Sequence, residues 1–522
     1  MGFAIRFAVG LLSALSLVCC RTYGQTDDLA LKSKRGKDLM AAGKFEEAIP
    51  VYRELVKDLP DNPGPVMNLG MALHMAGHER EAVKEFQEVL ELEPAHMPAR
   101  LFLGAAYLAL KEPSKAVEPL QTVVRGQPDN SEARLLLGEG LLALEHHRAA
   151  LQQYEELTRL DPGNPKVWSG LGESLEGLAS RSFEEVEKLA PESAYWLVLV
   201  AETRAMAEHY GPAFYLYREA LAKMPTLRGI HASIADIYGK SGHQDWARVE
   251  EEKERQLPPP HCATPPEQAD NRATSSASSG AHHNKGADEL ECDFLAGRYA
   301  KMVAVNPQTA EDFYWRTRAY NELARQAFSH LANLPPSAEV HELLAKIHFS
   351  QKSYGAAAKD WEEALKLSPG NPYYEQGFAI ALSAAGNFEA ARPLLEKAVK
   401  LSPDTPELNY WAGFTLLGLE KPEEAIPYLE KAVGGDPAVL QPQRDLARAY
   451  LRVGQVEKAI PHLKAALPLD NDGTLYYQLA QAYRKAGQKE LEKEMLAKFR
   501  KIQSSVNIEK KDFEKSLEIT PP

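Results

Sequence analysis

The sequence is poor in features that several large protein classes require. It has no long run of lysine and arginine, and its formal net charge is −13. It therefore offers the phosphate backbone of a nucleic acid little to bind, and we exclude a nucleic-acid-binding role. With 522 residues, of which 25% are charged and 44% apolar, the chain still has ample material for a folded core.

Patterns typical of catalysis and of metal or cofactor binding are also missing. The sequence contains no P-loop and no nucleophile elbow. The segment that starts at His341 begins like the zinc-protease pattern HExxH, but Ala345 stands where the second histidine is required. His348 lies about two helical turns away, which is too far for that kind of metal site. We predict no enzyme activity, no cofactor and no metal.

Long apolar runs are absent, which argues against a membrane-spanning helix. The longest, Phe7–Val18, has about a dozen residues, whereas a span needs roughly 20. Arg6 precedes this run and small residues follow it, so we interpret residues 1–24 as a signal peptide. We expect an exported protein, periplasmic or secreted. A lipid anchor at Cys20, which would associate the protein with the membrane, is the alternative.

Cysteine is scarce, with four in the whole chain and two of these within the signal peptide. The other two, Cys262 and Cys292, flank a Pro/Ser-rich stretch over residues 258–287. In an oxidising compartment such a pair is expected to form a disulfide, which would stabilise the fold by roughly 3 kcal/mol. The alternative is a metal site, whose ligands would be His261, Cys262, His282, His283 and Cys292.

A period of 34 residues organises the rest of the sequence. Small residues and prolines recur at this step: Gly36, Gly70, Gly104, Gly138 and Gly172, then Ala48, Ala82, Ala116 and Ala150, then Pro60, Pro94, Pro128 and Pro162. The small residues allow two helices to approach closely, and each proline ends the second helix of a pair. The period predicts a helix–turn–helix repeat whose copies stack on one another.

The segment Pro63–His96 resembles the tetratricopeptide repeat (TPR) family. The positions that carry the resemblance are Leu69, Gly70, Ala82, Phe86 and Pro94. The resemblance implies an all-α fold, a right-handed α-solenoid with a concave inner surface. It also implies a scaffold that binds a protein or peptide, because members of the family share an interaction role and little else.

The register of the period divides the chain into five segments. They are a signal peptide (1–24), an N-terminal array of about seven helix pairs (29–257), a linker (258–287), a C-terminal array (288–505) and a polar tail (506–522). Within the first array, Pro165–Ser193 is a pair whose second helix lacks about five residues. The C-terminal array starts with a degenerate unit, followed by five pairs. We expect the tail to be disordered.

The resemblance implies that the first helix of each pair faces the concave surface. In the C-terminal array this face carries three aromatic residues, three arginines spaced i, i+4, i+8, and two flanking residues: Tyr410, Trp411, Phe414, Arg444, Arg448, Arg452, Tyr477 and Arg484. Aromatic anchors beside a positive stripe suit a peptide that carries carboxylates or a free C-terminus. In the alternative interpretation the arginines pair with Asp445 or Glu457, and the aromatic residues belong to the core.

A second candidate surface lies in the N-terminal array, where Met67, Met71 and Met75 form a stripe. Methionine adapts to irregular apolar ligands, although the same residues could pack against adjacent helices. The sequence thus predicts a non-catalytic scaffold that binds a peptide or partner protein in the cell envelope. The alternative is an accessory or assembly factor for an envelope complex that handles polysaccharide.

Overall fold

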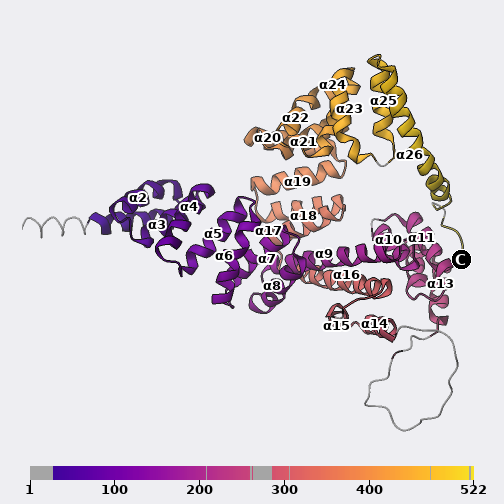
Figure 1. The fold of residues 1–522 in the computed structure, drawn as a ribbon, viewed down its shortest axis with the longest axis horizontal. Helices are drawn as coiled ribbons and strands as arrows, with labels where there is room; N and C mark the ends of the chain where they lie inside the picture. The colour runs from indigo at the N-terminus through magenta and orange to yellow at the C-terminus, as the bar shows by residue number, and fades with distance from the viewer. Residues whose placement is uncertain are drawn as a thin grey trace, which may run out of the picture. The chain divides into compact units, whose positions relative to one another are not determined.

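The computed structural model describes residues 28–206, 208–258, 262, 285–304, 306–470, 472–516 and 519–522. These residues form helices joined by short turns, with no strand among them, and the predicted all-α solenoid is confirmed (Figure 1). None of the helices in this part of the chain combines the length and apolarity that crossing a membrane would take. The predicted signal peptide, with Cys20, lies outside the described residues.

The chain divides into two compact units, residues 1–178 and 179–522. In the first unit, residues 28–41 are helical and pair with α2 (Phe45–Asp58). The pairs that follow are α3 (Pro63–Met75) with α4 (Glu79–Leu92), α5 (Met97–Ala109) with α6 (Pro113–Gly126), and α7 (Ser131–Ala143) with α8 (His147–Leu160). Each begins where the 34-residue period places it.

The second unit starts with two regular pairs, α10 (Ala194–Met206) with α11 (Tyr210–Lys223) and α12 (Ile230–Lys240) with α13 (Gln244–Gln256). An irregular group follows, made of α14 (Lys285–Leu295), α15 (Tyr299–Ala304) and α16 (Ala310–Ala332). The remaining pairs are α17 (Ala338–Ser350) with α18 (Tyr354–Leu367), α19 (Pro372–Ala384) with α20 (Phe388–Leu401), α21 (Pro406–Gly418) with α22 (Pro422–Gly435), α23 (Leu440–Arg452) with α24 (Val456–Ala466), and α25 (Thr474–Lys485) with α26 (Lys489–Ser516). A short 3₁₀ turn, η2 (Leu467–Leu469), precedes α25.

Within a pair, the two helices touch where a glycine of the first helix faces a large side chain of the second. A Cβ atom at Gly70 would lie 2.6 Å from Phe86, and one at Gly413 would lie 2.6 Å from Leu429. Phe86 and Leu429 are fully buried. The repeated glycine therefore sets the distance at which the helices pack, as the sequence pattern predicts.

The shortened pair predicted at Pro165–Ser193 is instead one continuous helix, α9 (Pro165–Leu189). In the regular pairs the intervening turn contains a residue with positive φ, such as Gly77, Lys111 and Glu145. At the matching place in α9 the chain stays helical, and none of its residues has positive φ. The missing residues thus removed the turn itself and left both helices fused.

One core cluster in the second unit contains residues from both sides of the Pro/Ser-rich stretch. Helices α10 to α13 contribute Phe214, Ile234 and Tyr238, while α14 and α16 contribute Leu290 and Trp315. The helices before and after residues 258–287 therefore share one hydrophobic core. The boundary between the two compact units lies within α9, not at residues 258–287.

The last helix reaches beyond the predicted end of the C-terminal array. Helix α26 continues to Ser516, past the predicted array end at residue 505, and residues 519–522 have a described placement. The described helix therefore extends into the segment that the sequence analysis assigned to the polar tail. The sequence after residue 505 contains no glycine, and no proline before Pro521, so nothing in it breaks a helix.

Candidate peptide-binding site

Three aromatic residues predicted to face the concave surface lie together on α21. The ring centroids of Tyr410 and Trp411 are 5.2 Å apart, and those of Trp411 and Phe414 are 5.6 Å apart. All three side chains are half-buried. Tyr410 and Trp411 pack against two different core clusters, so the rings partly belong to the core and partly remain available to a ligand.

Two of the three predicted arginines converge on Asp445 of α23, whose side chain is fully buried. Arg444 donates from Nε and Nη2 to its two oxygens, at 3.2 and 3.1 Å, and Arg448 lies 3.9 Å away. Tyr410 donates its hydroxyl to Asp445 at 3.3 Å, which joins the aromatic residues to the arginines. Hydrogen bonding to Asp445 raises the pKa of Arg444, and burial raises the pKa of Tyr410. We call Tyr410, Trp411, Phe414, Arg444 and Arg448 the arginine–aromatic surface.

Arg452, the third arginine of the stripe, has a different role. It donates from Nη1 to the carbonyl of Leu417 at 3.3 Å, in the last turn of α21. A cation there stabilises the carbonyl end of a helix. Arg452 thus ties α23 to α21, and it does not line the pocket described next.

Arg444 and Arg448 form one wall of an open pocket of about 530 Å³. The opposite side comes from the connection between α24 and α25 and from α25 itself, through Leu469, Asp470, Asp472, Thr474, Leu475 and Gln478. Both guanidinium side chains remain 40% exposed. The pocket lies next to the aromatic residues because Asp445 contacts both groups.

The charge of this pocket is mixed. Asp470 accepts a hydrogen bond from the amide of Tyr476 at 2.8 Å, and Asp472 accepts one from the amide of Thr474 at 2.9 Å. The hydrogen bonds from Thr474 lower the pKa of Asp472, which keeps it ionised. In this pocket, Nε of Arg448 and Oδ1 of Asp470 are buried, and neither has a hydrogen-bond partner among the described residues. The pocket therefore presents both donors and acceptors, as a peptide main chain does.

The two flanking residues predicted from the sequence lie on the outer part of α25. Tyr477 is 43% exposed, and its ring packs 5.2 Å from Phe499. Its hydroxyl accepts from Gln481 at 2.7 Å, and Arg484 donates to the same glutamine. Gln481 thus links Tyr477 to Arg484, but neither of these two residues lines the pocket.

The methionine stripe of the first unit is only partly exposed. Met67 is 7% exposed and belongs to the core cluster of this unit, Met71 is half-buried against the same cluster, and Met75 is 51% exposed. Only Met71 and Met75 therefore retain surface for a ligand.

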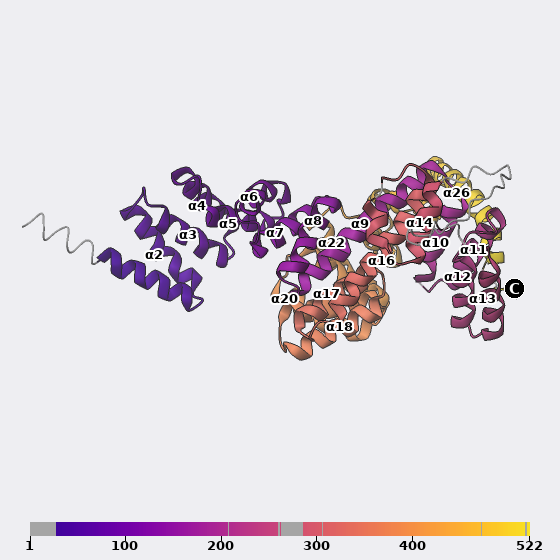
Figure 2. The same cartoon turned by 90° about the horizontal axis from the view of Figure 1, so that it is seen from below.

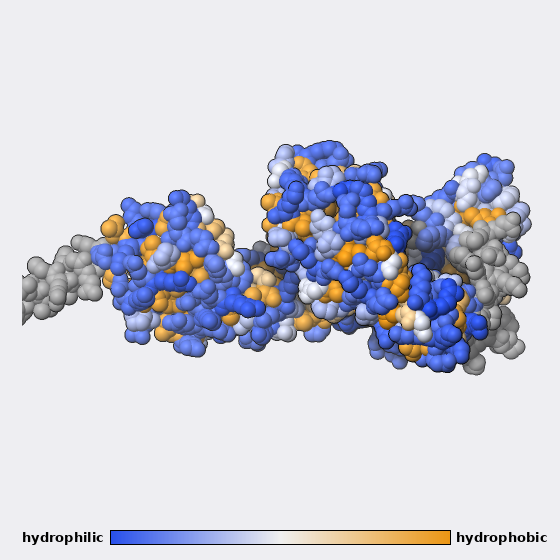
Figure 3. All heavy atoms as spheres, turned by 90° about the horizontal axis from the view of Figure 1, so that it is seen from above, coloured by the Kyte–Doolittle hydropathy of each residue, from blue (hydrophilic) through white to orange (hydrophobic). Residues whose placement is uncertain are grey.

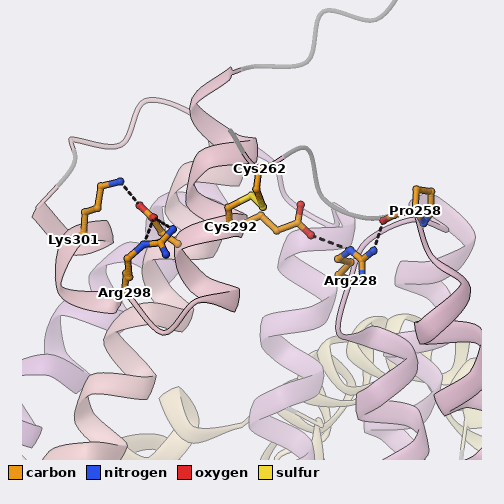
Figure 4. The surroundings of a disulfide bond; sticks show 8 residues. Arg228, Pro258, Cys262, Cys292, Arg298 and Lys301 are labelled. Carbon is orange, nitrogen blue, oxygen red and sulfur yellow. Dashed lines mark hydrogen bonds and ion pairs between the residues drawn. A yellow bond between two sulfur atoms is a disulfide. The ribbon is translucent and has the colours of Figure 1, made fainter. Parts of the chain in front are cut away.

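Cys262 and Cys292 are joined in the structure by a disulfide (Figure 4). Next to it, Arg228 lies 3.7 Å from Glu291 and donates to the carbonyls of Leu257 and Pro258. The chain entering the Pro/Ser-rich stretch is therefore held from two sides. His261, His282 and His283 lie outside the described residues, so the alternative metal site stays untested.

Sequence reasoning considered the first helix of each pair, so it missed Asp470 and Asp472, which lie before α25. It also missed Gln478, although this residue lies on α25 itself. The available signal is the polar run at residues 470–473, Asp-Asn-Asp-Gly, directly before the last pair. Such a run favours a turn whose side chains and backbone groups are accessible. It also precedes the helix that faces the arginines.

Three family models, each described as tetratricopeptide repeat, match the sequence. They cover residues 73–140 and 416–490, then 33–79, 135–178 and 377–439, and finally 338–371. The last match spans the helix pair α17 and α18. These segments are tetratricopeptide repeats. The TPR helices α21, α23 and α25 thus carry the candidate site.

Solved structures with similar TPR helices include MamA of MSR-1, with 21% identity over 32% of this chain and 98% of that chain, and a TM-score of 0.29. MamA of Desulfovibrio magneticus RS-1 has 23% identity over 32% and 96%, with a TM-score of 0.29. YrrB, described as a TPR protein with an unusual peptide-binding site, has 23% identity over 32% and 87%, with a TM-score of 0.28. These likenesses concern the helical fold alone. The comparison with curated proteins finds no match.

Proposed function

We propose that this TPR protein binds an extended segment of a partner protein on the arginine–aromatic surface, without catalytic chemistry of its own. The observation that carries the proposal is the 530 Å³ pocket, which offers guanidinium donors and carboxylate acceptors beside half-buried rings. A main-chain segment can use both kinds of group, and an adjacent apolar side chain can pack on the rings.

The mixed charge refines the specificity predicted from the sequence. Arg444 and Arg448 bring two positive charges, whereas Asp445, Asp470 and Asp472 bring carboxylates to the same region. A ligand that is only anionic would meet repulsion from Asp470 and Asp472. We therefore propose a peptide held through its backbone, with a carboxylate as one group that Arg448 can bind. Binding that depends only on the ligand's carboxylates, and not on its backbone, would contradict this proposal.

The test compares two arginines of the same helix. Partners are captured from envelope extract with a photo-crosslinker at position 478, the crosslinked segment is identified, and its synthetic peptide is titrated. Arg448→Ala should weaken binding at least about ten-fold, because a charged donor is lost. Arg452→Ala, outside the pocket, should leave the affinity unchanged. An equal effect of both substitutions would contradict the proposal.

Salt separates a peptide from a polysaccharide ligand. Binding through Arg448 should weaken as ionic strength rises, whereas a sugar stacked on Trp411 should be insensitive to salt. Salt-independent binding of an oligosaccharide that depends on Trp411 would favour the role in an envelope complex that handles polysaccharide.

We further propose that the protein is exported and acts in the cell envelope. The proposal is supported by the sequence of residues 1–24 and by the pair of cysteines, since disulfides persist in oxidising compartments. Mass analysis of the mature N-terminus tests it. A chain that starts at Gln25 would support a cleaved signal peptide, a lipidated Cys20 would support an anchor, and an intact Met1 would contradict export.

A further inference from the structure

The last four residues of the chain lie against helices near the start of the second unit. Figures 1 and 2 both show the C-terminus beside α11 and α13. Ile519 packs against the core cluster formed by α10 to α16. Thr520 makes two hydrogen bonds there, so the contact has a defined register.

The two hydrogen bonds contact different groups of Thr520. Tyr238 of α12 donates its hydroxyl to the carbonyl oxygen of Thr520 at 2.6 Å. Arg218 of α11 donates from Nη1 to the Thr520 hydroxyl at 2.7 Å. One bond therefore recognises the peptide main chain, and the other recognises a hydroxyl side chain.

The groups that receive the tail are held in place by packing. Tyr238 is 1% exposed, and its ring lies 5.4 Å from Phe214 and 5.5 Å from Trp246. The guanidinium of Arg218 lies over the ring of Phe214 at 5.8 Å. Burial raises the pKa of Tyr238 to about 12, so the phenol stays protonated and can donate at any physiological pH. A surface with donors fixed in this way is already organised for a ligand.

The sequence of the tail suits an extended ligand. Thr520 precedes Pro521, and a residue before proline is restricted to extended backbone. Its carbonyl is then free to accept a bond from another element, as it does from Tyr238. Pro521 and Pro522 are themselves exposed, so the selective contacts come from the aliphatic and hydroxyl residues.

We propose that α11 and α12 form a second peptide-binding site, for extended segments in which an aliphatic residue precedes threonine and proline. The chain's own Ile519–Pro522 is its resident ligand. A partner segment of the same chemistry must displace this tail before it binds. This site is separate from the arginine–aromatic surface and stands without it.

The test uses a labelled peptide of residues 516–522, titrated into the full chain and into a variant that ends at Ser516. The shortened variant should bind the peptide, and the full chain should bind it at least about ten-fold more weakly, because the tethered tail competes at high effective concentration. Equal affinity for both proteins, or no binding to the shortened one, would overturn the proposal.

Matched substitutions in the shortened variant locate the site. Tyr238→Phe and Arg218→Ala should each weaken binding several-fold, whereas Lys223→Ala, on the same helix as Arg218, should not. When threonine in the peptide is replaced by valine, Arg218→Ala should no longer weaken binding, because the hydroxyl that Arg218 contacts is gone. This control leaves the protein unchanged. Arg448→Ala should leave this binding intact, which separates the result from the fate of the arginine–aromatic surface. Dependence on Lys223 equal to that on Tyr238 would place the peptide elsewhere and refute the assignment.

Discussion

At the scale of single residues, two glycines of one helix pair have opposite surroundings. An added Cβ at Gly413 would lie 2.6 Å from Leu429 and 3.3 Å from the carbonyl oxygen of Ala425, whereas one at Gly434 would meet nothing within 4 Å. Gly413 therefore serves helix contact, and Gly434 lies in α22 with no packing role that the structure shows.

Alanine at these two positions should therefore act in opposite directions. Gly413→Ala should destabilise the protein by about 2 kcal/mol, because Leu429 must move in a closely packed core. Gly434→Ala should stabilise it by up to about 1 kcal/mol, because alanine favours the helix. Urea-unfolding midpoints measured by circular dichroism check both signs. A loss of stability at both sites would show that the surroundings do not decide the effect.

His462 gives the stability a predictable pH dependence. It is partly buried between Tyr450, whose ring stacks on it at 5.8 Å, and Gln443, which accepts from its Nδ1 at 2.7 Å. Burial lowers the pKa of His462 below its usual 6.5, against a smaller opposing effect of Glu430. As pH falls below about 6.5, the unfolded chain binds the proton first, so the folded state loses stability until its own lower pKa is reached.

We expect the wild-type urea midpoint to fall more between pH 7.5 and pH 5.5 than that of His462→Gln. His78→Gln is the control, because the His78 side chain is 42% exposed. An identical pH dependence of wild type and His462→Gln would contradict the assigned cause.

At the scale of elements, the turn inside each pair uses one backbone geometry with different residues. In the α19–α20 turn, Gly386 has φ of 82° and the amide of Asn387 donates to Leu382 at 2.9 Å. In the α21–α22 turn, Glu420 has φ of 59° and the amide of Lys421 donates to Leu416 at 2.9 Å. Both are left-handed helix ends, a geometry that glycine adopts at least cost.

Exchanging glycine and non-glycine residues at these two turns should change the stability in opposite directions. Glu420→Gly should stabilise the protein and Gly386→Ala should destabilise it, each by about 1 kcal/mol, because a side chain is strained at positive φ. A Cβ at Gly386 would meet nothing within 4 Å, so its effect reports backbone strain alone. Thermal unfolding of both variants measures the difference. Stabilisation by alanine at position 386 would exclude strain as the cause.

At the scale of the whole molecule, an ion pair joins the segments before and after the Pro/Ser-rich stretch. Arg318 of α16 lies 3.1 Å from Glu202 of α10, and both side chains are mostly buried. Its guanidinium also stacks on Phe294 at 4.7 Å. Because removing one partner leaves the other charge buried and unpaired, Arg318→Met should cost about 3 kcal/mol.

The same helix supplies the control for this prediction. Arg325 pairs with Glu322 at the surface, where its side chain is 69% exposed, so Arg325→Met should change stability by less than about 0.5 kcal/mol. Hydrogen exchange of α10 and α16 should rise in Arg318→Met alone. Faster exchange in α16 without any change in α10 would show that the ion pair does not couple the two segments.

Much of the fold could be predicted from the sequence because its landmarks act locally. Gly70, Ala82 and Pro94 each fix a contact or an end within their own repeat, and the helix bounds follow. The fusion in α9 could not be read from the same landmarks, since Gly172 stays in register while the turn after it is gone. The pocket was half predicted: Arg444 and Arg448 follow from helical spacing, whereas Asp470 and Asp472 depend on how the next pair docks.

The contact between the tail and α11 spans 302 residues of sequence. In a stack of repeats nearly all of the remaining contacts join neighbouring repeats. Repeats can therefore form in any order and unfold from a free end. The bonds of Thr520 to Arg218 and Tyr238 require the intervening helices to be in place first, because closing so long a segment of unfolded chain has a large entropic cost. We expect them to form last during folding and to break first during unfolding, which makes them an internal reporter that the second unit has been completed.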